Sequence, residues 1–166
     1  MKKIFAYTLI IFSIFISAGF AGTLDGIYYD WSVFVLDNLG EEKKCYVVSF
    51  PKKSIGNYKK EREPYVLITR FRDKGIEEVS VYSGFEYKIG SDIYASIDGK
   101  QFRMFTDKDI AWAKAKTDDK DMIQAMLNGE IFKIRAESST AEYVVDEYSL
   151  KGLTRAYRKM KDLCKK

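Results

Sequence analysis

The residue types that most often carry chemistry are scarce in this chain. Its 166 residues include no histidine and only two cysteines, Cys45 and Cys164. The absence of histidine excludes His-based catalytic triads and histidine metal ligands, and it removes the usual proton-transfer group near neutral pH. Two cysteines are too few for a four-cysteine zinc site. We therefore expect a protein that is not an enzyme and that holds no metal or other cofactor.

A cluster of three aspartates is the strongest remaining candidate for metal binding. Asp118, Asp119 and Asp121 resemble the start of a calcium loop, but such a loop needs glycine at its sixth position and glutamate at its twelfth. The sequence has Ile123 and Gly129 at these positions. Because acidic residues also favour the start of a helix, we interpret the cluster as a first helical turn.

Asp107 and Asp109 form a second carboxylate group, beside an expected turn. Two carboxylates can serve a glycoside hydrolase, so a hydrolase is one alternative class for this protein. Carboxylates near a turn are usually only solvated, and no nucleophile motif or metal constellation accompanies these two. We therefore expect no catalytic role for them.

The first 21 residues have the pattern of a secretory signal peptide. Lys2 and Lys3 precede an apolar run that ends in small residues at Gly19 and Ala21. The alternative is a membrane anchor, because the run of about 18 residues is at the lower limit for crossing a bilayer. No basic stop-transfer cluster follows it. We expect cleavage after Ala21, which leaves residues 22–166 as a single domain without a stable transmembrane segment.

The charge and composition of the chain narrow its class further. The formal net charge is +4, and half of this excess comes from Lys2 and Lys3 in the expected signal peptide. A nucleic-acid partner is therefore not indicated. Hydrophobic residues make up 46% of the chain and charged residues 31%, which is the composition of a folded globular protein.

Short runs of alternating residues predict a mainly β fold with about nine or ten strands, as in an antiparallel sandwich or barrel. The Asp98-Gly99 pair between two such runs predicts a tight hairpin, because both turn positions need a positive φ. The expected strands cover residues 28–36, 45–50, 65–71, 77–82, 85–89, 93–97, 100–105, 110–115, 131–136 and 143–145. The aromatic residues expected in the core are Trp31, Phe34, Phe102, Phe105 and Trp112.

Two segments have helical spacing instead. Residues 118–128 begin with aspartates and are followed by a glycine, which predicts a short internal helix. In residues 153–164 one apolar stripe predicts an amphipathic C-terminal helix, and its members are Leu153, Ala156, Tyr157, Met160 and Cys164.

The position of Cys164 on this stripe favours a disulfide with Cys45. A cysteine on the stripe faces the protein body, where a cysteine on a strand can reach it. Export would place both residues in an oxidising compartment, where an even pair usually forms a disulfide. The alternative is two separate buried thiols.

The C-terminal helix is also the most basic segment. Between Lys151 and Lys166 there are seven basic residues and one acidic residue. Such a helix can bind an acidic partner or an anionic membrane surface, or its charges can be merely solvated. We hypothesise a partner-binding face formed by Arg155, Arg158, Lys159 and Lys161. A second basic cluster lies in a loop and contains Lys52, Lys53, Lys59, Lys60 and Arg62.

Several motifs, taken in order, resemble the invasion-associated locus B family of exported envelope proteins of Gram-negative bacteria. The resemblance covers most of residues 30–164. The motifs are Asp30-Trp31-Ser32-Val33, Lys44-Cys45-Tyr46-Val47-Val48-Ser49 with Pro51-Lys52, Glu78-Val79-Ser80, Ile97-Asp98-Gly99, Ala111-Trp112-Ala113, Met122 to Gly129, Tyr148 to Leu153, and Cys164.

This resemblance implies an immunoglobulin-like antiparallel β-sandwich in the periplasm or outer envelope, and a link to host-cell invasion that some members have. It supplies no catalytic residue. Together with the residues, it leads us to expect a non-enzymatic virulence-associated protein that acts by contact with a protein partner of the envelope or the host cell. Secretion from the cell is a further alternative for its location, and a small-molecule or glycan-binding periplasmic module is the alternative function.

Overall fold

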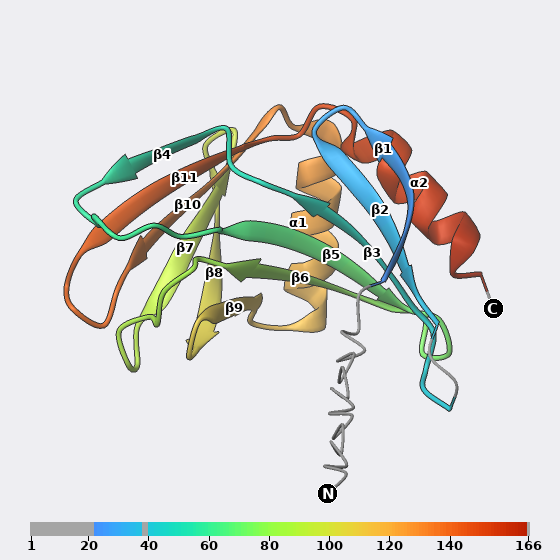
Figure 1. Cartoon of the computed structure of the whole chain (residues 1–166), viewed down its shortest axis with the longest axis horizontal. Coiled ribbons are helices and arrows are strands. Elements are labelled where there is room, and N and C mark those ends of the chain that lie inside the picture. Colours follow the sequence, from blue (N-terminus) through green and yellow to red (C-terminus); the bar gives the residue numbers. More distant parts are fainter. Residues whose placement is uncertain (1–21, 38–39, 166) are drawn as a thin grey trace, which may run out of the picture.

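The described residues, 22–37 and 40–165, form one antiparallel sheet of eleven strands and two helices in the computed structural model of the chain (Figure 1). The expected signal peptide, residues 1–21, lies outside the described residues. The strands are β1 (Thr23–Tyr28), β2 (Trp31–Leu36), β3 (Lys44–Ser49), β4 (Lys53–Gly56), β5 (Tyr65–Phe71), β6 (Ile76–Tyr82), β7 (Asp92–Ile97), β8 (Lys100–Asp107), β9 (Ile110–Ala113), β10 (Ile131–Glu137) and β11 (Tyr143–Ser149). The helices are α1 (Lys116–Asn128) and α2 (Leu153–Leu163).

The sheet curves around α1, and its strand order is β1-β2-β3-β5-β6-β9-β8-β7-β10-β11-β4 (Figure 1). Helix α1 packs against β6 and β9, whereas α2 packs against β1, β2 and β3. Both helices cover the concave inner face, because the strand residues that meet them belong to the same alternating set of buried side chains. The opposite face of β2, β3, β5 and β6 is here called the outer face.

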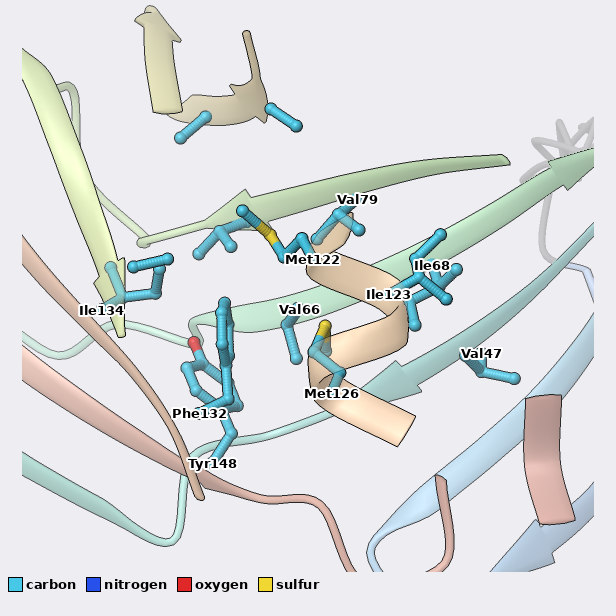
Figure 2. Close-up of a cluster of buried hydrophobic side chains, with 14 of the residues drawn as sticks. Val47, Val66, Ile68, Val79, Met122, Ile123, Met126, Phe132, Ile134 and Tyr148 are labelled. Carbon is cyan, nitrogen blue, oxygen red and sulfur yellow. The ribbon is translucent and has the colours of Figure 1, made fainter. Parts of the chain in front are cut away.

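The core lies between the curved sheet and α1 (Figure 2). Met122, Ile123 and Met126 point from α1 toward the inner face of the sheet and are almost completely buried. Burial of each such side chain stabilises the fold by about 1.5–3 kcal/mol. Phe132 of β10 and Tyr148 of β11 reach the same cluster from the other end of the sheet. The curvature therefore lets one sheet enclose one core.

Helix α2 begins at a position where only glycine fits. Gly152 has a φ of +96°, and a Cβ atom built there would lie 2.0 Å from the carbonyl oxygen of Tyr28. From that start, Leu153, Ala156 and Met160 are buried. The apolar stripe of α2 thus faces the core, as the sequence predicted.

The mainly β class, the internal helix and the C-terminal amphipathic helix are confirmed. The resemblance implied an immunoglobulin-like antiparallel sandwich. In the structure, hydrogen bonds link all the described antiparallel strands into a single curved sheet. The predicted hairpin is also present, with φ angles of +46° at Asp98 and +92° at Gly99.

The structure departs from the predicted strands in three places. Residues 28–36 were expected to form one strand, but a turn at Tyr29, whose φ is +56°, separates β1 from β2. Residues 85–89 form no strand and contribute an isolated bridge between Tyr87 and Ser138. Strand β4 was not predicted, because its four residues are all exposed and show no alternation.

The core prediction for aromatic residues was correct on the inner face. Trp31 is completely buried, and Phe102 is 9% exposed. Phe105 is 40% exposed, so its assignment to the core was wrong. Phe34 and Trp112 are only partly buried; Phe34 lies on the outer face, and Trp112 of β9 lines a hollow beside the start of α1.

Candidate functional site

The disulfide pair holds the C-terminal helix to the sheet. Cys45 of β3 and Cys164, which follows α2, are completely buried, and their sulfur atoms lie at disulfide distance. The Arg70 side chain adds a hydrogen bond from its Nε to the Cys164 carbonyl, at 3.3 Å. This geometry agrees with the predicted pairing. It fixes the end of α2 and therefore the direction of its outward side.

The four predicted partner-binding residues do not share one environment. Arg155, Arg158 and Lys161 are exposed on the outward side of α2, and these three residues are here called the basic face. Lys159 is half-buried, and its Nζ lies 3.4 Å from a carboxylate oxygen of Asp25 in β1. Among the described residues, no carboxylate pairs with a residue of the basic face.

A compensated acidic group lies beneath the basic face. Glu77 accepts a hydrogen bond from the Tyr157 hydroxyl at 2.6 Å and another from Arg70 Nη1 at 2.6 Å. Burial, together with the hydrogen bond to Glu77, raises the pKa of Tyr157. Because Arg70 neutralises Glu77, this carboxylate does little to cancel the positive charge outside it.

A groove of about 590 Å³ separates the end of α1 from α2. Leu127 and Asn128 of α1 form part of one wall, while Arg158 and Lys161 of the basic face line the other. Lys165 also lines the groove, although its Nζ pairs with Asp162 at 2.6 Å. The basic face therefore borders a hollow as well as an open surface.

The aspartate cluster lies at the start of helix α1, where one of its members bonds to strand β6. Asp119 is 7% exposed, and its Oδ1 accepts a hydrogen bond from the backbone N–H of Val79 at 2.8 Å. Burial raises the pKa of Asp119 to about 6. Asp118 lies in the first turn of α1, in agreement with the helix-start interpretation. The described residues contain no group of three or more metal-ligating side chains placed to hold an ion.

The other two carboxylates lie at the β8–β9 turn. Asp107 ends β8, and Asp109 follows Lys108, whose φ is +52°. The Asp109 backbone carbonyl accepts a hydrogen bond from the Ser83 N–H at 3.4 Å. Within the described part of the chain, neither carboxylate has a side-chain partner that would mark it as an acid or a base.

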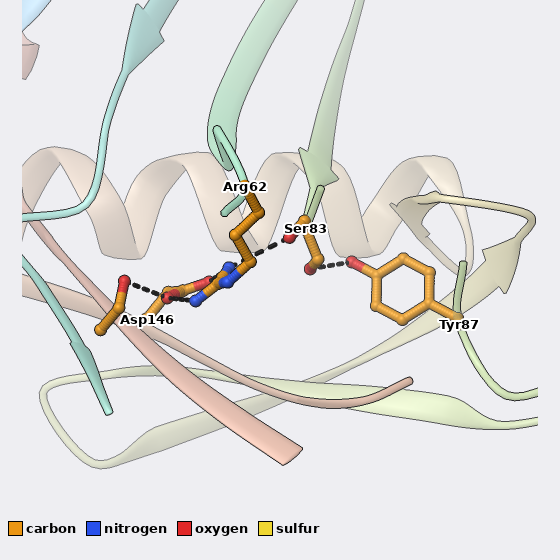
Figure 3. Close-up of polar contacts among 5 residues, drawn as sticks. Arg62, Ser83, Tyr87 and Asp146 are labelled. Atoms are coloured by element: carbon orange, nitrogen blue, oxygen red, sulfur yellow. Dashed lines mark hydrogen bonds and ion pairs between the residues drawn. The ribbon is translucent and has the colours of Figure 1, made fainter. Parts of the chain in front are cut away.

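The residues of the predicted basic cluster lie in different environments, and the charge of Arg62 is not presented on the surface. The Arg62 guanidinium points inward and bonds both carboxylate oxygens of Asp146, at 2.6 and 2.5 Å (Figure 3). Asp146 also accepts a hydrogen bond from Ser54, and Arg62 donates another to the Ser83 carbonyl. Lys52 separately pairs with Asp30 at 2.5 Å. The loop therefore presents less free positive charge than its composition indicated.

The sequence reasoning missed a groove on the outer face, with a volume of about 990 Å³. We call it the aromatic groove. It is lined by Phe34, Tyr46, Val48, Phe50, Glu61, Arg62, Glu63, Tyr65, Leu67, Tyr82 and Gly84. The available signal was alternation: in β3 and β5 both sets of alternating residues are largely apolar, although a strand with one face in water normally has only one such set.

These features define a mainly β protein whose C-terminal helix is held to the sheet by a buried cysteine pair and whose surface carries two grooves. The family model for the Invasion associated locus B (IalB) protein matches residues 31–161, so the chain belongs to this family, as its motifs predicted. No curated protein and no solved structure matches the chain. Membership indicates an invasion-associated envelope protein.

Two further findings bear on location. A buried cysteine pair at disulfide distance fits a protein that resides outside the cytoplasm. Neither helix in the described part of the chain combines the length and the apolar character needed to cross a membrane.

Proposed function

We propose that this protein is a non-enzymatic envelope component that binds an acidic protein partner through the basic face of α2. Its role is to support host-cell invasion or envelope integrity, from the periplasm or the outer envelope. The observation that carries the proposal is the fixed presentation of Arg155, Arg158 and Lys161 on the outward side of a helix whose opposite side lies in the core.

The way α2 is held favours a protein partner over a membrane surface. A helix that binds a bilayer inserts its apolar side among the lipid chains. In α2 that side is already occupied, because Leu153, Ala156 and Met160 are buried against the sheet. The charges alone remain available, and a fixed array of cations is suited to carboxylates on a complementary surface.

Charge reversal tests this proposal. The triple variant Arg155→Glu, Arg158→Glu and Lys161→Glu should keep the fold, because these side chains are exposed. It should lose saturable binding to its partner, measured by crosslinking in bacterial envelope extract and, separately, on host-cell membranes. A bacterial partner would support a role in envelope integrity, and a host partner a role in invasion.

Two control variants sharpen the test. The first control is the triple variant Lys100→Glu, Lys108→Glu and Lys120→Glu, which makes the same change in charge at exposed positions away from α2. This variant should still bind the partner. Lys159→Glu should weaken binding less than any single reversal on the basic face, because Lys159 is engaged with Asp25. Undiminished binding by a correctly folded triple variant would refute the proposal.

A further inference from the structure

The aromatic groove lies on the opposite side of the sheet from both helices. Phe34 comes from β2, Tyr46 from β3, Tyr65 from β5 and Tyr82 from β6, and these four strands are consecutive neighbours in the sheet. The inner residues of the same strands form the core with α1 and α2. The groove therefore follows the outer face across four strands.

The rings in the groove are held by one another. Phe34 and Tyr46 stack with their centroids 5.2 Å apart, and Tyr65 and Tyr82 stack at 4.9 Å. Phe50, which is 57% exposed, meets Tyr65 edge-on at 6.5 Å. Stacked rings lose little freedom when a ligand covers them, so the groove offers preformed π surfaces. Both Tyr46 and Tyr65 are neutral at physiological pH, as tyrosine ordinarily is, and burial raises the pKa of each further.

The charge of the groove is negative, and the Arg62–Asp146 pair is the reason. Glu61 and Glu63 are exposed on either side of Arg62 and line the groove with it. The positive charge of Arg62 is directed inward and satisfied by Asp146. Among the described residues, neither glutamate forms an ion pair. Two exposed carboxylates without an ion pair thus stand beside a row of π faces.

This wall of the groove is fixed by packing. Gly84 has a φ of +75°, and a Cβ atom built there would lie 2.7 Å from the Cβ of Arg62. The Arg62 guanidinium lies over the Phe85 ring, 5.8 Å from its centroid. The segment that carries Glu61 and Glu63 is therefore held against the sheet, and its carboxylates have a defined position relative to the rings.

We infer that the aromatic groove binds an extended, cationic segment of a partner protein. Apolar or proline side chains of the segment lie on the rings, and its lysine or arginine side chains lie between the rings and the two glutamates. Aromatic rings attract cations, arginine above all, and aromatic-lined grooves also accept extended proline-containing peptides. Four adjacent strands span roughly 14 Å, which is the length of about four or five extended residues.

This site is independent of the one proposed for α2. The two surfaces lie on opposite faces of the sheet and prefer ligands of opposite charge, so the failure of either assignment leaves the other standing. A neutral oligosaccharide could also stack on the rings, but it would not require the glutamates. The contribution of Glu61 and Glu63 therefore distinguishes a cationic peptide from a glycan.

The test uses the protein expressed from its full sequence and a fluorescent eight-residue peptide of alternating arginine and proline, with binding measured by fluorescence anisotropy. The double variant Glu61→Gln and Glu63→Gln should bind the peptide about tenfold more weakly, because it removes two charge-assisted contacts. The matched control, Glu86→Gln and Glu130→Gln, makes the same change in charge at exposed positions outside the groove and should bind as wild type does.

A second variant tests the rings. Tyr65→Leu with Tyr82→Leu keeps apolar bulk but removes two π faces, and it should weaken peptide binding about fivefold while the circular dichroism spectrum stays unchanged. Equal binding of the peptide by wild type and by the Glu61/Glu63 variant would overturn the inference. Binding of a neutral glucose oligomer, with no binding of the peptide, would also overturn it and would assign the groove to glycans.

Discussion

Arg62 and Asp146 are 84 positions apart in the sequence and form a two-pronged ion pair in the interior, with N–O distances of 2.6 and 2.5 Å (Figure 3). Their side chains are 8% and 0% exposed. Ser54 and the Ser83 carbonyl complete their hydrogen bonds, and Ser83 in turn contacts the Tyr87 hydroxyl at 2.5 Å. One pair therefore joins the segment before β5, the end of β6, and strands β4 and β11.

Breaking this pair should be costly. Asp146→Ala leaves the Arg62 charge buried without a partner, and such a loss typically costs about 3–5 kcal/mol in the free energy of unfolding. Urea denaturation would measure it. The exposed Lys88–Glu137 pair supplies the control, since Glu137→Ala should cost less than about 1 kcal/mol. A loss for Asp146→Ala as small as that of this control would contradict a stabilising role for the buried pair.

Replacing both partners should restore much of the loss. Buried ion pairs replaced by apolar residues of similar volume are often neutral or stabilising. The double variant Arg62→Met with Asp146→Leu should therefore be more stable than Asp146→Ala in the same urea experiment. A double variant that is no more stable than Asp146→Ala would show that Ser54 and the Ser83 carbonyl need these partners in their own right.

The cysteine pair should be oxidised in the exported protein. Denatured, unreduced protein should show no free thiol on labelling, whereas a reduced sample should show two. Closing a loop between residues 119 positions apart stabilises the fold by about 4–5 kcal/mol in the chain-entropy model. The Cys45→Ser and Cys164→Ser double variant should lose stability on this scale. Two labelled thiols in the unreduced sample would refute the pairing.

Stability should depend on pH through Asp119. The folded state raises the pKa of this carboxyl from 3.8 to about 6, because burial disfavours the charged form. The folded state therefore holds the proton more tightly than the unfolded chain does, and stability decreases as pH rises from about 4 to 6. Asp119→Asn lacks this titration and keeps an oxygen for the Val79 N–H. Its stability relative to wild type should increase by about 1–2 kcal/mol between pH 4 and pH 7.

Denaturation of both proteins at the two pH values measures this change. Asp121→Asn is the matched control, because Asp121 belongs to the same helix but is exposed. It should follow the wild-type pH dependence. A constant difference between Asp119→Asn and wild type across this range would contradict the burial of an ionisable Asp119.

Gly152→Ala should be more damaging than a similar change elsewhere. Gly152 combines a φ of +96° with a close approach to the Tyr28 carbonyl, so alanine meets both backbone strain and a clash. Gly90 has a φ of +74°, and a Cβ atom built there would have nothing within 4 Å. Gly90→Ala therefore measures the backbone strain without a clash. Positive-φ strain costs of order 1 kcal/mol or more. Thermal denaturation should show a clearly larger loss for Gly152→Ala than for Gly90→Ala, and equal losses would contradict the close packing of α2 against β1.

Most of the local elements and the family could be predicted from the sequence. Alternation placed most strands, Asp98-Gly99 placed a hairpin, and helix punctuation with the stripe ending at Cys164 placed both helices. These signals are readable because strand and helix periodicities are local properties of the chain. Motif order likewise indicated the family that the comparison then confirmed.

The way these elements pack together could not be predicted from the sequence and follows from the folded structure. Strand β4 pairs with β11, and β9 lies between β6 and β8, through contacts that no local pattern encodes. Periodicity separated Tyr46 from Val47 but did not reveal that the helices cover the Val47 face and leave the Tyr46 face open. In the same way, the sequence indicated a solvated loop charge at Arg62, whereas the fold places Asp146 of β11 in contact with it. A carboxylate 84 positions away can be matched to its partner only once the chain has folded, because the pairing depends on register and curvature rather than on spacing in the sequence.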